Sequence, residues 1–322
     1  MKKILLLLPL LSIATTLPSQ SFPRQLFVAS SALKLRQEPT RKSEVLATMT
    51  IGEPVQVEEK SPDEYYDRYD RIDSLDGYWI KVRYKDRTGY AFCPYLVSRY
   101  NLYYEFNAVQ YLPKMNNWYG VYKKSNGEEE IRAIKVRIKT VSDPDLGHSH
   151  KMLYTDQKDT SLFIIGTNEV IRPGYAGIFS RNYTRNSGID LTIKPGVECW
   201  LYTRVERSTI KGEHYHLFGT GTYQISEYGL QLENFKIWVA KNNPPDSRYT
   251  VIQDLSPYFS FMVTEGSVNV QWVGDLDRDG KPDAILQCCS TQQCTNILFL
   301  SSEAGTNELL GPVSSYSWYD EC

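Results

Sequence analysis

Alternation of apolar and polar residues along the chain predicts β-strands. Ile134, Val136 and Ile138 alternate with basic residues, and comparable runs occur at 189–193, 201–205 and 235–239. Side chains with period two lie on alternate faces, so each run fits a strand with one buried face. Asn126-Gly127 between two such runs predicts a hairpin turn, because both residues tolerate a positive φ. No segment after the N-terminal apolar run shows a helical apolar period, so the pattern predicts an all-β protein.

The N-terminus has the pattern of a secretory signal peptide. Lys2 and Lys3 precede an apolar run from Ile4 to Leu11, and small and polar residues follow. The run is far shorter than the roughly 20 residues of a membrane-spanning helix, so a retained anchor is the weaker interpretation. No later run predicts a transmembrane segment. We therefore expect a signal peptide over residues 1–21 and a secreted or periplasmic mature protein.

Length and charge limit the remaining classes. A chain of 322 residues is long enough for two or three domains, and we place them at 24–100, 101–245 and 246–322. The Asn242–Asp246 cluster between the last two is typical of a linker. The formal net charge of −2 argues against a general nucleic-acid binder, which would carry a basic surface. The oligomeric state is not constrained by these features.

The cysteines predict disulfides. There are six of them, at positions 93, 199, 288, 289, 294 and 322. Their even number and an oxidising compartment favour disulfides over thiolate metal ligands, since no paired CxxC motif occurs. We expect Cys322 to pair with Cys288, Cys289 or Cys294, because a chain end is frayed unless tied down. Cys93 with Cys199 is a second, weaker pairing.

Short strand and turn signals follow one another between residues 24 and 100. In order they are Leu33-Lys34-Leu35-Arg36, a turn at Pro39, Val45-Leu46, a turn at Gly52, Trp79 to Val82, Thr88-Gly89-Tyr90 and Tyr95-Leu96. This order resembles the bacterial SH3 domain family over about a quarter of the chain. The resemblance implies a small SH3-like barrel that is not catalytic and that binds peptidoglycan or peptides.

An insertion distinguishes this region from its relatives. Residues 60–76 are longer than the usual loop and are rich in tyrosine and aspartate. Tyr65, Tyr66 and Tyr69 beside Trp79 would form an aromatic groove, so these four are the predicted ligand-binding residues. The alternative is that Trp79 belongs to the barrel core and that the insertion is solvated.

The middle block contains the only candidates for catalysis. All four histidines lie in two His-x-His pairs, His148 with His150 and His214 with His216, which would bind zinc or copper if their strands were neighbours. The second pair resembles zinc peptidoglycan endopeptidases, but Asn186 stands where their first ligand should be. Cys199 with His214 or His216 is the only candidate dyad. A cell-envelope hydrolase that uses either site is therefore the alternative function.

An acidic loop in the last block predicts a calcium site. The motif Asp-x-Asp-x-Asp-Gly-x-x-Asp supplies carboxylates at Asp275, Asp277, Asp279 and Asp283, and the Lys281 carbonyl can add an oxygen. Calcium takes six to eight oxygen ligands, and alternate loop positions can converge on one ion.

The flanking residues separate this loop from a helix-loop-helix calcium hand. The twelfth position holds Leu286 instead of Glu, and strand-like runs lie on both sides, so we expect a strand-loop-strand site. The loop resembles that of integrin-type FG-GAP repeats, although only one copy occurs. The alternative is a solvated acidic turn.

Together these features predict three β units in order: an SH3-like barrel, a β-rich middle domain, and a small C-terminal β domain with a structural calcium site. No complete catalytic motif occurs. We therefore expect an exported, non-catalytic binding or scaffold protein of the cell envelope.

Overall fold

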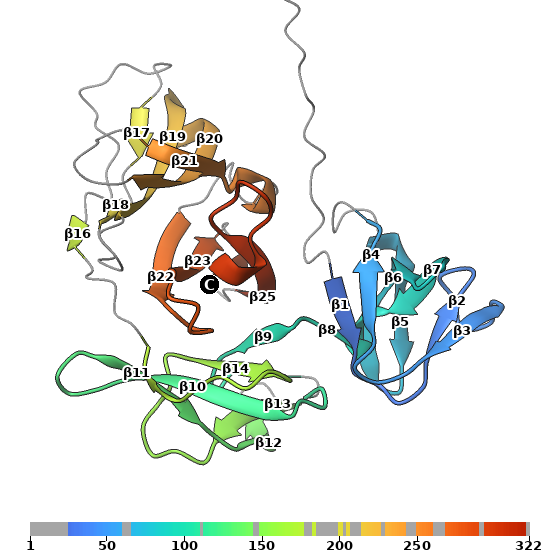
Figure 1. Cartoon of the computed structure of the whole chain (residues 1–322). Coiled ribbons are helices and arrows are strands. Elements are labelled where there is room, and N and C mark those ends of the chain that lie inside the picture. Colours follow the sequence, from blue (N-terminus) through green and yellow to red (C-terminus); the bar gives the residue numbers. More distant parts are fainter. Residues whose placement is uncertain are drawn as a thin grey trace, which may run out of the picture.

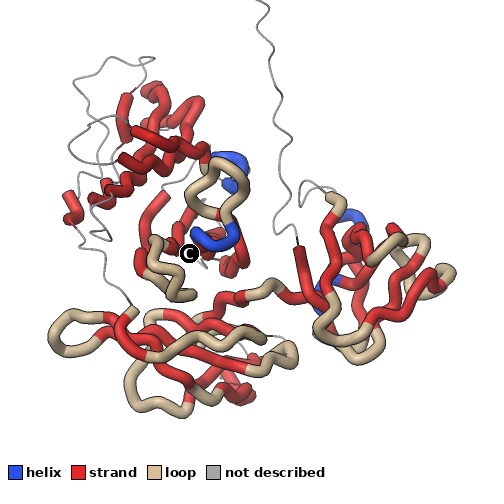
Figure 2. Tube along the Cα trace, in the orientation of Figure 1, coloured by secondary structure: helices blue, strands red, loops and turns tan. Residues whose placement is uncertain are grey.

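The computed structural model describes residues 25–59, 66–109, 112–143, 148–176, 182–184, 199–201, 204–206, 214–226, 229–242, 249–259, 268–289 and 293–319. These residues form β-strands and short 3-10 helices, which confirms the all-β class (Figure 1, Figure 2). No helix among them is long and apolar enough to cross a membrane. The predicted signal peptide, residues 1–21, lies outside the described residues.

The N-terminal strands wrap around a core of their own. They are β1 (Gln25–Val28), β2 (Leu33–Arg36), β3 (Val45–Met49), β4 (Pro54–Val57), β5 (Tyr69–Ile72), β6 (Leu75–Tyr84), β7 (Arg87–Phe92) and β8 (Leu96–Val97). The antiparallel order is β3-β2-β7-β6-β4-β1-β8, and β5 pairs with β6 (Figure 1). Leu35, Met49 and Val82 are fully buried in the shared core. We call residues 25–97 the barrel.

Two contacts fix the barrel near its turns. A Cβ at Gly77 would lie 2.4 Å from the Pro94 ring, so only glycine lets β6 pass the 3-10 turn Cys93–Tyr95. Glu53 accepts hydrogen bonds from the Tyr84 hydroxyl (2.6 Å) and the Thr50 amide (2.8 Å), and it pairs with Lys85. These bonds, the one from Tyr84 above all, lower the pKa of Glu53 to about 2.

The rest of the described chain forms three larger sheets or ribbons and two small ones. The β9–β15 sheet contains β9 (Tyr100–Tyr103), β10 (Asn117–Lys123), β11 (Glu129–Ala133), β14 (Phe163–Thr167) and β15 (Gly174–Tyr175). The C-terminal sheet contains β22 (Val268–Gly274), β23 (Asp283–Cys289), β24 (Gln293–Leu300) and β25 (Gly311–Tyr319). The β19–β20 sheet contains β17 (Cys199–Leu201), β19 (His214–Ser226), β20 (Gly229–Asn242) and β21 (Tyr249–Asp254). The small pairs are β12 (Val136–Asp143) with β13 (His148–Thr155), and β16 (Asn182–Thr184) with β18 (Arg204–Glu206).

The C-terminal sheet is buried on both faces. On β24, Leu298 and Leu300 pack against the β9–β15 sheet, whereas Ile297 and Phe299 pack against the β19–β20 sheet. A strand that is covered on both faces carries an uninterrupted apolar run instead of an alternating one, and Ile297–Leu300 is such a run. Among the described residues, the predicted division between 101–245 and 246–322 is therefore not a division between hydrophobic cores.

The β9–β15 sheet is also covered on both faces. Tyr119 and Val121 of β10 join the core under the C-terminal sheet, and the next residue, Tyr122, joins a second core with Leu153 of the β12–β13 hairpin. The order of the layers is thus hairpin, β9–β15 sheet, C-terminal sheet and β19–β20 sheet. We call this stack, from residue 100 to residue 319, the layered body.

Candidate metal centre and ligand surfaces

The acidic loop joins β22 to β23, which pair antiparallel as Gly274 meets Asp283. The structure therefore has the strand-loop-strand arrangement expected from the sequence. Two residues of the loop have a positive φ, Arg278 at 69° and Gly280 at 81°. Nothing lies within 4 Å of a Cβ built on Gly280, so glycine is needed there for its backbone conformation and not for space.

Three carboxylates of the loop converge. Oxygens of Asp275, Asp277 and Asp283 all lie within 4.8 Å of one another. Asp283 is fully buried and Asp275 is 9% exposed. The Oδ1 atom of Asp275 is buried and has no hydrogen-bond partner among the described residues. Burial, reinforced by the neighbouring carboxylates, raises the pKa of both groups. The loop therefore brings three carboxylates together, and two of them, Asp275 and Asp283, are largely shielded from water.

Two serines that sequence analysis missed complete the arrangement. Asp283 accepts hydrogen bonds from the backbone amides of Leu276 (2.6 Å) and Ser301 (2.9 Å). The Ser301 hydroxyl lies 3.0 Å from Asp279, and the Ser302 hydroxyl donates to Asp277. Both serines lie in the 3-10 turn Ser301–Glu303 that follows β24. This turn brings two hydroxyl groups beside the carboxylates.

The basic residues of the loop point elsewhere. The Arg278 guanidinium donates to the backbone carbonyls of Tyr175 and Arg172, next to β15. The Lys281 side chain is exposed, and its amide donates to Asp279 (2.8 Å). The Asp275 amide donates to the Ala176 carbonyl (2.9 Å). The loop is thus fixed on the β9–β15 sheet, and among the described residues no ion pair joins Arg278 or Lys281 to its carboxylates.

The predicted aromatic groove of the barrel is only partly accessible. Tyr65 lies outside the described residues, and of Tyr66 only the backbone is described, in the 3-10 turn Tyr66–Arg68. Tyr69 is 57% exposed, its hydroxyl donates to Asp76, and its ring meets that of Tyr78 edge to face at 5.9 Å. Of the groove side chains that the structure describes, Tyr69 is therefore the one that a ligand can reach.

Trp79 corrects the prediction. It is 3% exposed, its ring packs on Phe92 at 5.7 Å, and its Nε1 donates to Asp70 (3.1 Å). A side chain covered in this way offers no contact face, so including Trp79 among the ligand-binding residues was wrong. Its physical role is to position Asp70, which also pairs with Arg41 (3.4 Å).

The strand register separates the histidine and cysteine candidates. β13 pairs with β12, whereas β19 pairs with β17 and β20, so the two His-x-His strands are not neighbours and the four-histidine site is wrong. Cys199 lies opposite Gly221, five positions along β19 from His216, which is about 17 Å at roughly 3.3 Å per residue. A Cys199 dyad with His216, or with the more distant His214, is therefore also wrong.

Two cysteines are free thiols, which corrects part of the disulfide prediction. The Cys93 Sγ accepts a bond from the Tyr78 amide (3.4 Å), so the pairing of Cys93 with Cys199 is wrong. Cys288 is also free and lies in the core, so it is not the partner of Cys322. Burial raises the pKa of both thiols to about 11. The side chains of Cys199, Cys289 and Cys322 lie outside the described residues, so the pairing of Cys322 stays a prediction.

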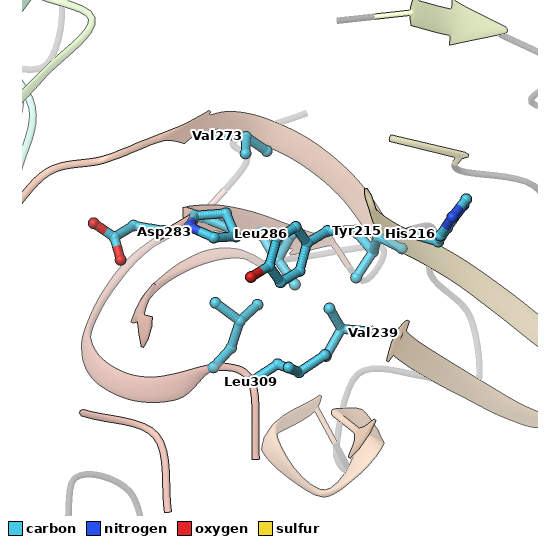
Figure 3. Close-up of a pocket in the computed structure, with 11 residues that line it drawn as sticks. Tyr215, His216, Val239, Val273, Asp283, Leu286 and Leu309 are labelled. Carbon is cyan, nitrogen blue, oxygen red and sulfur yellow. The ribbon is translucent and has the colours of Figure 1, made fainter. Parts of the chain in front are cut away.

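An apolar pocket lies between the β19–β20 sheet and the C-terminal sheet, with about 430 Å³ of empty space that includes open solvent. Leu217, Val239 and Leu286 are among its lining residues. The Tyr215 ring lies over the pocket, whereas the imidazole of His216 and the carboxylate of Asp283 point away from it (Figure 3). The part of the pocket surface seen in this view is therefore formed mainly by apolar side chains.

Comparison with known proteins bears on the barrel alone. No curated protein and no solved structure matches the chain. The acidic loop and the layered body fall outside the stretch that matches a protein family. That stretch runs from the turn before β2 to the end of β8, as the strand order of the barrel leads us to expect. Residues 31–97 match the family model of the bacterial SH3 domain.

Proposed function

We propose that this chain is an exported, non-catalytic binding protein of the cell envelope. In this proposal the barrel recognises peptidoglycan or a peptide, and the layered body carries a structural calcium ion. The observation that carries the binding role is the match of residues 31–97 to the bacterial SH3 domain, on a barrel with its own core. The N-terminal signal pattern supports export.

The exposed face of the β5–β6 hairpin is the part of the barrel that we assign to the ligand. Tyr69 is its most exposed aromatic side chain, and Tyr78 supports it from β6. An aromatic ring beside carboxylates suits a ligand with both apolar and polar or cationic groups. This is the composition of a peptide or of a peptidoglycan stem.

Sedimentation with insoluble peptidoglycan tests this role. We expect the purified protein to pellet with it and Tyr69→Ser to bind about three- to tenfold more weakly, the usual worth of one aromatic contact. Tyr175→Ser is the matched control, because Tyr175 is 47% exposed on the layered body. A wild-type protein that binds neither peptidoglycan nor its stem peptides would contradict the proposed function. Equal losses of peptidoglycan binding in the two variants would show that Tyr69 does not contact the ligand.

The non-catalytic part of the proposal has a separate test. Purified protein should release no soluble fragments from peptidoglycan and should contain no stoichiometric zinc. Fragment release that depends on zinc would instead support the hydrolase.

The calcium part rests on the buried carboxylates of the loop. Burying the Asp283 carboxylate, and an Asp275 oxygen that has no hydrogen-bond partner among the described residues, destabilises the folded protein unless a cation compensates the charge. Hard oxygen donors favour calcium, and the acidic motif has the alternating spacing of carboxylates that can converge on one ion. We expect an affinity of about 10⁻⁴–10⁻³ M, as in extracellular modules. Equilibrium dialysis should find one ion per chain in the wild type and none in Asp275→Asn.

A further inference from the structure

The β12–β13 hairpin presents one face to solvent. Residues 106–109 run beside β13, since the Phe106 amide donates to the Leu153 carbonyl and the Val109 amide to the Lys151 carbonyl, both at 2.8 Å. Leu153 is fully buried against the β9–β15 sheet. Figure 1 shows the hairpin on the side of β10 and β14 that faces away from β22–β25. Successive side chains of a strand point to opposite faces, so the hairpin side chains on the face opposite to Leu153 point outward.

Three basic residues line this outer face. Lys135, Arg137 and Lys139 alternate along β12, so they share one side, and all three are exposed. None of them forms a salt bridge with a described residue. Asp156 is an acidic neighbour: its carboxylate accepts a hydrogen bond from the Lys135 amide (3.0 Å) and so offsets the charge of Lys135 in part. Arg137 and Lys139 have no such acidic partner among the described residues, on a chain whose formal net charge is −2.

Aromatic side chains lie directly beside these charges. Tyr154 is opposite Arg137 in the sheet register, and the Lys139 ammonium lies 4.4 Å from the centre of the Tyr154 ring. The Phe106 ring meets Tyr154 edge to face at 5.3 Å and is 45% exposed.

The backbone of Phe106 is strained. Its φ of 64° is rare for a bulky residue and persists only where the surroundings enforce it. The hydrogen bond from the Phe106 amide to the Leu153 carbonyl helps to hold this conformation, in which the Phe106 ring is partly exposed to solvent.

We propose that this outer face binds the surface of an anionic lipid bilayer. Arg137 and Lys139 would contact phosphate groups, and Phe106 would enter the boundary between headgroups and acyl chains. A soluble polyanion would bind the basic side chains but would not bury an exposed phenyl ring, whereas an anionic bilayer does both. This surface is distinct from the barrel and from the calcium loop, so the inference goes beyond the proposed function.

Sedimentation of the full chain with lipid vesicles tests the inference. We expect binding to phosphatidylcholine vesicles that contain phosphatidylglycerol, weaker binding to pure phosphatidylcholine, and loss of binding in high salt. The double variant Arg137→Gln, Lys139→Gln should bind about 25-fold more weakly, since each basic residue contributes about fivefold. Lys42→Gln with Lys81→Gln removes the same charge from exposed positions of the barrel and should bind like the wild type.

Phe106→Gly separates binding from folding. Glycine tolerates a positive φ, so this variant should melt at the same temperature as the wild type or higher while binding vesicles more weakly. A lower melting temperature with unchanged vesicle binding would show a purely structural role and overturn the inference. Equal binding to both kinds of vesicle, or equal losses in the double variant and its barrel control, would also overturn it. So would binding to soluble polyphosphate that is as strong as binding to vesicles.

Discussion

Trp272→Phe tests the packing between the C-terminal sheet and the β9–β15 sheet. Trp272 is 1% exposed, its Nε1 donates to the Glu129 carboxylate (2.7 Å), and its ring meets Phe163 at 5.1 Å. A hydrogen bond to a charged group contributes about 1.5–3 kcal/mol, and the smaller ring loses about 1 kcal/mol of burial. We expect the free energy of unfolding to fall by about 3 kcal/mol.

Urea denaturation measures this loss, with Trp238→Phe as the matched control. Trp238 is half-buried on the outer β19–β20 sheet and donates to the Thr220 hydroxyl (2.9 Å), so its replacement should cost about 1 kcal/mol. Because one core joins the two sheets, Trp272→Phe should also speed amide exchange in β10. Unchanged exchange in β10, or a loss no larger than that of the control, would refute the shared core.

Three further predictions concern the barrel and the buried thiols. Because the pKa of Glu53 is lowered to about 2, its ionised carboxylate stabilises the folded protein fully above about pH 4.5, and this stabilisation is lost as the pH falls towards 2. The free energy of unfolding of Glu53→Gln, measured over the same pH range, should lack this loss. Gly77→Ala should lower the free energy of unfolding in urea by about 1–3 kcal/mol, because its Cβ would overlap the Pro94 ring, and an unchanged midpoint would contradict that contact. With a pKa of about 11, Cys93 and Cys288 should react with a thiol reagent at pH 8 about 100-fold more slowly in the folded protein than after unfolding, and equal rates would contradict their burial.

Local structure was predictable where neighbouring residues determine it. The expected strand signals at Leu33–Arg36 and Val45-Leu46 lie in β2 and β3, and the Asn126-Gly127 turn joins β10 to β11 with Gly127 at a φ of 84°. The acidic motif also predicted its own strand-loop-strand geometry, because its ligand spacing and turn glycine lie within nine residues.

Features that depend on distant segments were not predictable in this way. The apolar run Ile297–Leu300 is compatible with a buried strand or a helix segment, and only the sheets on either side show why both of its faces are apolar. The burial of Trp79 depends on Phe92 and on Asp70, which come from other strands. Ser301 and Ser302 carry no motif, and the β24 turn alone brings them to the acidic loop.

Calcium binding at the 275–283 loop is tested most directly by thermal unfolding of the wild type and Asp277→Asn, with excess calcium and then with chelator. Calcium at about 30 times its dissociation constant should stabilise the wild type by about 2 kcal/mol, which raises the melting temperature by about 4–8 °C. Asp277→Asn should show little rise, whereas Asp86→Asn, an exposed turn position of the barrel, should respond like the wild type. A wild-type melting temperature that does not change with calcium, or an equal rise in Asp277→Asn, would contradict the site.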